Sequence, residues 1–200
     1  MHHFGLKVGA SSCRVRDASI GLVVFLDRLL QADLRVPDPP NRPSWHHMLE
    51  RAGLRTLELG TGCGIVGIYL ASTVANSRCL LTDLPEAMEL LRLNMQAARL
   101  APGSVLIGEV LDWDQPLPRA VEVNGFDLIV ISDCTYNCDS VPSLVSTMTS
   151  LALSSPSAIV LVSMKVRHES EFVFFEHIAA NRFVILQHDT LHFPHQAANK

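Results

Sequence analysis

The fold is indicated most clearly by one stretch of the sequence, Leu57-Glu58-Leu59-Gly60-Thr61-Gly62-Cys63-Gly64-Ile65-Val66-Gly67. Apolar residues lead up to Gly60, and closely spaced glycines follow. Such a run is typical of a buried strand that turns sharply into a helix, because glycines let the backbone bend tightly and approach a ligand. Gly62, Gly64 and Gly67 also satisfy the spacing of a dinucleotide-binding turn. The first question is therefore which nucleotide binds there.

Glu58, directly ahead of these glycines, bears on that question. Its carboxylate would repel a pyrophosphate, whereas it can accept a hydrogen bond from an ammonium or a ribose hydroxyl. NAD and flavin adenine dinucleotide carry a pyrophosphate, and S-adenosylmethionine carries cationic groups without a phosphate. The glycine turn alone admits all three, and Glu58 favours the last. The alternative for Glu58 is a structural ion pair.

The composition of the chain bounds the other possibilities. Its 200 residues suffice for one α/β domain with a substantial core, and 48% apolar with 18% charged residues describes a globular protein. A net charge of -4 gives no general attraction to nucleic acid or to an anionic membrane. No run is long and apolar enough to span a bilayer, and the N-terminus lacks the pattern of a secretory signal.

The cysteines indicate the compartment. Five of them occur without the spacing of a disulfide framework, so free thiols are expected. We therefore expect the protein in the cytoplasm, with the nucleus as a second location. A metal site is not expected: His46 and His47 are adjacent and point apart in a helix, and Cys134 and Cys138 have no second pair at zinc-site spacing.

Strand and helix patterns alternate from Leu54 onward, which predicts a Rossmann-like, doubly wound, mostly parallel sheet of the α/β class. We expect residues 1–53 to form an N-terminal helical extension and residues 54–200 to form the cofactor-binding domain, the two packed as one unit. The expected strands are 54–59, 78–82, 105–110, 126–132, 158–164 and 183–187, and the expected helices are 17–32, 45–51, 64–74, 85–99, 141–153 and 169–180.

Asp83 lies at the end of the second expected strand. In sheets of this kind the ligand binds beyond the carboxyl ends of the strands, and an acidic residue about 20 positions after the glycines holds the ribose hydroxyls. We assign that role to Asp83. Its alternative role is to cap a helix ahead of Pro85. Asn94 falls inside the next expected helix, where it is expected on the surface.

Four parts of the sequence form one pattern: Glu58-Leu59-Gly60-Thr61-Gly62-Cys63-Gly64, Asp83, Asp112-Trp113 and Asp133-Cys134-Thr135-Tyr136, the last containing an Asp-x-x-Tyr motif. In order and spacing they resemble the seven-strand, class I methyltransferases, and more narrowly the methyltransferase-like protein-lysine methyltransferase family. Some fungal members of that family are labelled nicotinamide N-methyltransferase-like. The resemblance covers about residues 17–193, and residues 165–171 and 174–175 also look like the family's segment after the fifth strand.

The resemblance implies S-adenosylmethionine as cofactor and S-adenosylhomocysteine as product. It places Asp112 and Trp113 beside the adenine, where an indole can pack and a carboxylate can meet the exocyclic amine. The alternative for Trp113 is to cover an edge of the core. The residues expected to bind the cofactor are Glu58, Gly60, Gly62, Gly64, Asp83, Asp112, Trp113 and Asp133.

Asp133 and Tyr136 are the expected catalytic residues. Methyl transfer needs a neutral amine, and a lysine with a pKa of about 10.4 must first lose its proton. Asp133 would accept a hydrogen bond from the amine, and the ring of Tyr136 would wall the lysine channel. The alternatives are a helix cap by Asp133 and simple packing by Tyr136.

The implied substrate is a protein that carries the target lysine. Two other functions stay open: methylation of a small-molecule amine, and a catalytically weak fold that binds the cofactor and acts as a scaffold. Two departures from the family accompany the resemblance. Arg16 stands where members usually carry Trp, and no segment after Phe193 reads as the seventh strand of the family's closing antiparallel hairpin. Three explanations stay open: the sheet ends short, another segment fills its edge, or the chain is a truncated form.

Overall fold

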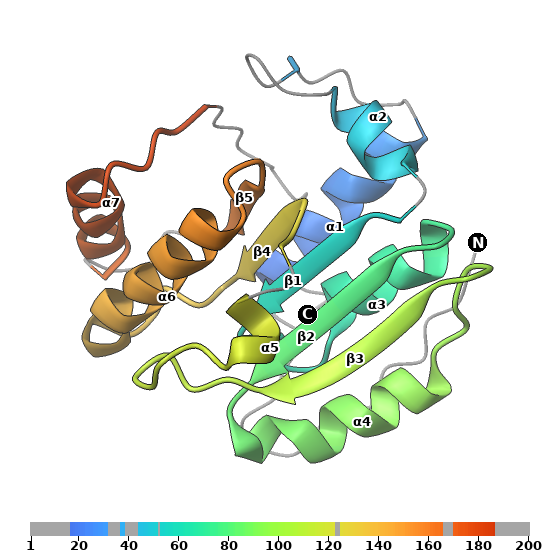
Figure 1. The fold of residues 1–200 in the computed structure, drawn as a ribbon, viewed down its shortest axis with the longest axis horizontal. Helices are drawn as coiled ribbons and strands as arrows, with labels where there is room; N and C mark the ends of the chain where they lie inside the picture. The colour runs from blue at the N-terminus through green and yellow to red at the C-terminus, as the bar shows by residue number, and fades with distance from the viewer. Residues whose placement is uncertain are drawn as a thin grey trace, which may run out of the picture.

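The computed structural model of the protein describes residues 17–31, 37–38, 44–51, 53–122, 125–165 and 170–186. Five parallel strands form one sheet in the order β3-β2-β1-β4-β5 (Figure 1). The strands are β1 (Arg55–Leu59), β2 (Arg78–Asp83), β3 (Val105–Val110), β4 (Leu128–Ser132) and β5 (Ile159–Ser163). The helices are α1 (Asp17–Leu30), α2 (Trp45–Glu50), α3 (Ile65–Thr73), η1 (Pro85–Ala87), α4 (Met88–Ala97), α5 (Arg119–Glu122), η2 (Cys138–Ser140), α6 (Val141–Ser154) and α7 (Ser170–Ala180).

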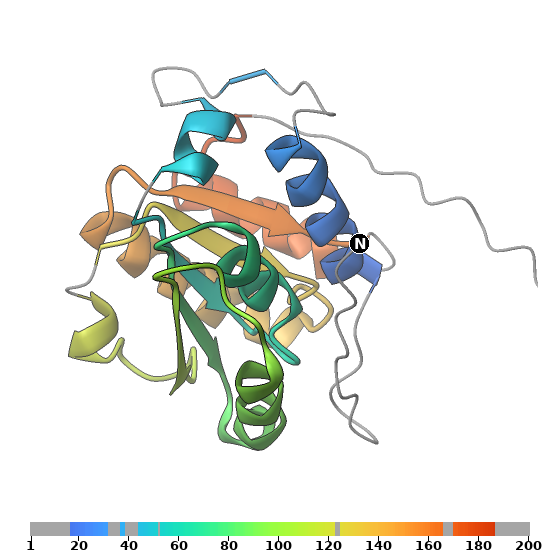
Figure 2. The same ribbon diagram turned by 90° about the vertical axis from the view of Figure 1, so that its right-hand side faces the viewer.

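Helices cover both faces of the sheet, as Figures 1 and 2 show from two directions. Alternate residues of a strand point to opposite faces, so a strand buried on both sides reads as one apolar run. In β4, Leu128 and Val130 join the core under α1, α2, α3 and α4, whereas Ile129 and Ile131 join the core under α5, α6 and α7. The apolar run of β4 therefore places this strand in the middle of the domain.

The strand order reverses at β1, which pairs with β2 on one side and β4 on the other. Leu59 lies level with Thr82 in β2 and with Ile131 in β4. The carboxyl ends of these three strands therefore meet at one edge of the sheet. That edge is the switch point at which open α/β sheets bind their ligands.

The expected α/β fold is confirmed, and most expected elements agree with the structure to within a few residues at their ends. The short helix α5 was not expected in its proline-bearing loop. None of the helices described in this structure is both long enough and apolar enough to cross a membrane.

The prediction of a strand at residues 183–187 is wrong for residues 183–186, which are the part that the structure describes. Residues 183–186 form no regular structure, and Val184 and Ile185 are 77% and 57% exposed. A strand needs a neighbour to hydrogen-bond with, and among the described residues β5 pairs only with β4. Gln187, Arg16, residues 166–169 and the segment after Phe193 lie outside the described residues.

Candidate functional site

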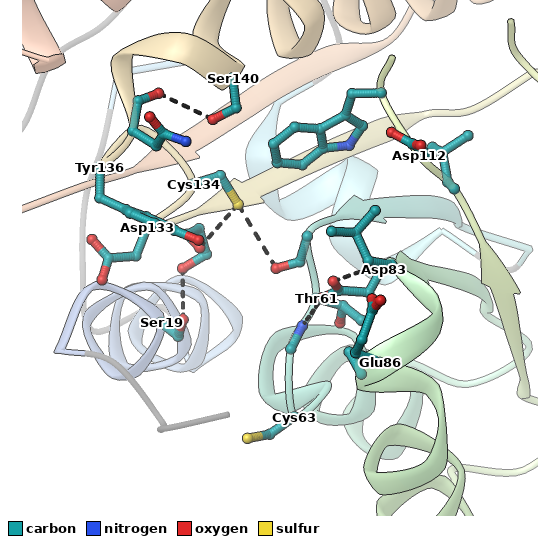
Figure 3. A pocket seen from close by; sticks show the side chains of 18 of the residues that line it. Ser19, Thr61, Cys63, Asp83, Glu86, Asp112, Asp133, Cys134, Tyr136 and Ser140 are labelled. Carbon is teal, nitrogen blue, oxygen red and sulfur yellow. Dashed lines mark hydrogen bonds between the residues drawn. The ribbon is translucent and has the colours of Figure 1, made fainter. Parts of the chain in front are cut away.

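A cavity of about 370 Å³ opens at the switch point of the sheet (Figure 3). This volume lies in the range of about 300–1,000 Å³ found for small-molecule sites. Its wall comes from the loops after β1, β2, β3 and β4 and from the first turn of α1. The described residues that line it are Ser19, Gly60, Thr61, Gly62, Cys63, Ile65, Asp83, Leu84, Glu86, Ala87, Leu111, Asp112, Trp113, Asp114, Ser132, Asp133, Cys134, Tyr136, Asn137, Ser140 and Ser143.

Gly60 lines this cavity, and its backbone has a conformation that favours glycine. Its φ is +62°, and a Cβ there would lie 2.6 Å from Cys134 Sγ and 3.2 Å from Trp113 Cζ2. Gly62, with φ of +57°, also lines the cavity. Gly64 does not line it: it begins α3 at φ +81°, and a Cβ there would meet Leu91 of the core. Gly64 is thus placed for packing beneath the site.

Asp83 connects the glycine loop to the end of β2. Its Oδ2 accepts a hydrogen bond from the Gly62 backbone N–H at 2.6 Å, and its Oδ1 accepts one from the Leu84 N–H at 2.8 Å. The side chain borders the cavity. Leu84, not Asp83, occupies the N-cap position of η1, and no side chain caps that turn. The ribose contact expected of Asp83 remains a prediction.

Glu58 lies beneath the glycine loop and is not among the lining residues. It is 1% exposed, and its Oε2 accepts hydrogen bonds from Thr61 Oγ1 at 2.7 Å and from the Gly67 N–H at 2.9 Å. Burial raises the pKa of Glu58 to about 7. Both donors are neutral, so Glu58 supports the turn from inside. Its contact with a cofactor remains a prediction.

Asp112 and Trp113 follow β3 and border the cavity opposite α1. The indole of Trp113 is half-buried against the apolar cluster under α6 and lies over Gly60. Asp112 Oδ1 accepts a hydrogen bond from the Asp114 N–H at 3.0 Å, which holds the loop in a turn. Trp113 therefore covers an edge of the core and also borders the cavity, and its contact with the adenine remains a prediction.

Asp133 stands at the end of β4 with its carboxyl group in the cavity wall. It is 5% exposed, adopts the left-handed φ of +55°, and donates its N–H to the Ser163 carbonyl at 2.8 Å. Asn137, not Asp133, caps the following turn, since its side chain accepts a hydrogen bond from the Asp139 N–H. Tyr136 lines the same cavity and is 57% exposed, which does not fit core packing.

Sequence reasoning missed several residues of the site. Asn94 is 4% exposed rather than on the surface, and its amide donates to the Cys63 carbonyl at 3.0 Å. An asparagine inside a helix is unfavourable by itself and was the available signal. Ser19 of α1 and Ser132 also line the cavity, and no local pattern marked them.

Together the parallel sheet and the cavity at its switch point define a Rossmann-like α/β protein. Two solved structures share this fold. Precorrin-6y C5,15-methyltransferase of Geobacter metallireducens is 12% identical with a TM-score of 0.54, over 90% of this chain and 78% of that one. A putative O-methyltransferase from Klebsiella pneumoniae is 18% identical with a TM-score of 0.51, over 84% of this chain and 72% of that one.

Residues 6–181 match the family model described as lysine methyltransferase, and the chain belongs to this family. UPF0665 family protein C23C4.06c of Schizosaccharomyces pombe is 30% identical over 78% of this chain and 44% of its own length. Protein-lysine N-methyltransferase EFM6 of Saccharomyces cerevisiae is 26% identical over 70% and 61%, and protein N-lysine methyltransferase METTL21A of Danio rerio is 34% identical over 60% and 53%. The chain spans about half the length of these relatives.

The residues present fit S-adenosylmethionine, the cofactor of this class. Gly60 and Gly62 line the cavity with backbone alone, and the carboxylates of Asp83, Asp112 and Asp133 border it. Among the described lining residues none is Lys, Arg or His. A negatively charged wall attracts a ligand with cationic groups and repels a pyrophosphate.

Proposed function

We propose that this protein is an S-adenosylmethionine-dependent N-methyltransferase that methylates a lysine side chain of a protein substrate. Membership of the lysine methyltransferase family supports the proposal, as do relatives named as protein-lysine methyltransferases. The observation that carries it is the shared cavity: Gly60 and Asp83 on one side and Asp133 and Tyr136 on the other line the same space.

When bound, the cofactor supplies an electrophilic methyl group on a sulfonium. Asp133 is placed to contact the amine that accepts this methyl group. Its carboxylate accepts a hydrogen bond from the amine and favours the positive charge that develops on the nitrogen. The backbone of Asp133 is held by its bond to the Ser163 carbonyl, so the carboxylate needs little reorganisation when the amine arrives.

Tyr136 forms the entrance to this carboxylate. Its exposed ring is placed to contact an incoming side chain, and the face of an aromatic ring attracts a cation. Asp133, in contrast, is almost fully buried. A lysine side chain is a long, narrow alkyl chain with a polar end, so its amine can pass an exposed aromatic ring and reach a buried carboxylate. This difference in exposure supports a protein side chain as the substrate.

The test is methyl transfer from cofactor carrying a labelled methyl group to whole-proteome and metabolite fractions in parallel. We expect label in protein, recovered as methyl-lysine after hydrolysis. Asp133→Asn preserves the shape and tolerates the left-handed backbone, and it should lose transfer while still binding S-adenosylmethionine; Asp133→Ala should do the same. Asp139→Asn, which neutralises an exposed acid outside the lining, is the matched control.

Other outcomes separate the alternatives. Label in small amines alone would favour a small-molecule methyltransferase. Cofactor binding without transfer to either fraction would favour a scaffold. Full activity of Asp133→Asn would remove Asp133 from the mechanism.

We also propose a reducing compartment, with the cytoplasm first and the nucleus second. Cys63, Cys79 and Cys134 are buried, Cys138 is exposed, and none of these four described cysteines is in a disulfide. These described cysteines are compatible with that environment.

A further inference from the structure

Ser19 lies in the first turn of α1, far from the glycine loop in sequence, yet its side chain belongs to the cavity wall. Ser132 Oγ donates a hydrogen bond to Ser19 Oγ at 2.9 Å, and Ser132 also lines the cavity directly before Asp133. Figure 3 shows Ser19 on α1 beneath Asp133 and across the cavity from Asp112. Two hydroxyl groups from distant parts of the chain therefore meet at one end of the site.

Two further contacts hold the first turn of α1 against the sheet. Ser163 Oγ donates to the Ala18 carbonyl at 2.8 Å, and Lys165 Nζ pairs with Asp17 Oδ2 at 2.8 Å. The ion pair is exposed and contributes little. The bond from Ser163 is half-buried and joins α1 to the end of β5. Ser19 is thus held at the cavity independently of its own hydroxyl.

The cavity has one end beside β3 and β2 and another beside β4, because the strands lie in the order β3-β2-β1-β4-β5. Trp113 and Asp112 follow β3, and Asp83 ends β2, so the groups suited to adenine and ribose lie on that side. A ligand whose nucleoside lies there extends past the glycine loop after β1 toward β4. Its other end then reaches the side of Ser132 and Ser19.

That other end of S-adenosylmethionine is an amino acid with an ammonium and a carboxylate. A carboxylate is held by cations or by hydrogen-bond donors. The described lining contains no Lys, Arg or His, and the hydroxyl groups of Ser19 and Ser132 are neutral polar groups at that end. Resting on the proposed function, we propose that the hydroxyl pair of Ser19 and Ser132 binds the amino-acid end of the cofactor. Ser19 is then a cofactor-binding residue contributed by α1.

The test compares two ligands by calorimetry. S-adenosylmethionine has the amino-acid arm, whereas 5′-methylthioadenosine keeps the nucleoside and the sulfur but lacks the arm. Ser19→Ala and, separately, Ser132→Ala should each weaken S-adenosylmethionine about tenfold, because the first removes the donor to a charged group and the second removes the hydrogen bond that orients this donor. Binding of 5′-methylthioadenosine should stay unchanged.

Ser154→Ala is the matched control. It also removes a half-buried serine hydroxyl that donates to a carbonyl, that of Leu151, but Ser154 lies at the end of α6 and is not among the lining residues. It should leave the affinity of both ligands unchanged, and melting curves of the three variants show whether each stays folded. An equal loss for both ligands in Ser19→Ala, no loss for either, or the same loss in Ser154→Ala would overturn the inference. If the unaltered protein binds neither ligand, the proposed function fails and the inference fails with it.

Discussion

The backbone N–H of Gly62 donates to Asp83 Oδ2 at 2.6 Å, so one carboxylate spans the glycine loop after β1 and the end of β2. The expected ribose contact of Asp83 and its role in shaping the loop thus depend on the same group. The bond ties the loop to its neighbouring strand before any ligand arrives. Preorganisation of this kind reduces the cost of binding.

Asp83→Asn should therefore weaken S-adenosylmethionine by about tenfold or more, because it replaces a charged acceptor of the Gly62 N–H and removes a ribose acceptor. Calorimetry measures the change. Glu89→Gln neutralises an exposed acid of the nearby helix α4, outside the described lining, and should bind as the unaltered protein does. Equal affinities of Asp83→Asn and Glu89→Gln would contradict this role.

Gly60→Ala tests the close approach of the loop to Cys134. The added methyl would lie 2.6 Å from Cys134 Sγ, so we expect a loss of stability of about 1–3 kcal/mol and of cofactor binding. Denaturant unfolding and calorimetry measure the two effects. Cys134→Ala in the same chain should recover part of the stability, since it removes the contacting sulfur.

Gly53→Ala separates backbone strain from crowding. Gly53 has φ of +84°, but no described atom outside its neighbours lies within 4 Å of a Cβ built there. It should lose less stability than Gly60→Ala, and it should not respond to Cys134→Ala. Equal losses at both glycines would mean that backbone strain alone accounts for the Gly60 effect.

Glu58 should make stability depend on pH. Burial raises its pKa from 4.5 to about 7 in the folded protein. The folded state therefore binds this proton more strongly than the unfolded state does, and the resulting stabilisation is full below pH 4.5 and lost as the pH rises through about 7. We compare the free energy of unfolding of the unaltered protein with that of Glu58→Gln. The first minus the second should fall as the pH rises from 4.5 to about 7. A difference that stays constant, or rises with pH, would contradict the assignment.

Asn94→Ala should loosen the glycine turn from below. The amide of Asn94 donates to the Cys63 carbonyl at 3.0 Å in a buried setting, so its loss leaves that carbonyl unsatisfied and should cost about 1–3 kcal/mol. Thermal unfolding measures the cost. Asn181→Ala is the control, because the same type of amide-to-carbonyl bond there is exposed. An equal, small cost at both positions would show that the bond to Cys63 adds nothing.

The sheet was predictable because its strands are short apolar runs bounded by turn residues, and β4 is the clearest of them. The expected strand at 183–187 failed because its apolar pattern does not supply a neighbour, and pairing is a property of the whole fold. Gly60, Asp83 and Asp133 were predictable as site residues because each follows a strand whose carboxyl end faces the switch point.

Ser19 and Asn94 were not predictable from local pattern. Ser19 reaches the cavity only because α1 packs across the ends of β4 and β5, 113 residues away from Ser132 in sequence. The sequence also does not predict that Glu58 Oε2 accepts hydrogen bonds from Thr61 and Gly67 inside the turn, and the contact of Glu58 with a cofactor remains a prediction. A side chain at a strand end can point to either face, and the position in the sequence does not say which hydrogen-bond donors it meets.

Calorimetric titration of the unaltered protein with S-adenosylmethionine, and in parallel with NAD, shows directly which of the two cofactors the cavity binds. We expect one-site binding of S-adenosylmethionine and no binding of NAD, because the described wall of the cavity carries carboxylates without a Lys, Arg or His to hold a pyrophosphate. Binding of NAD without binding of S-adenosylmethionine would contradict this expectation.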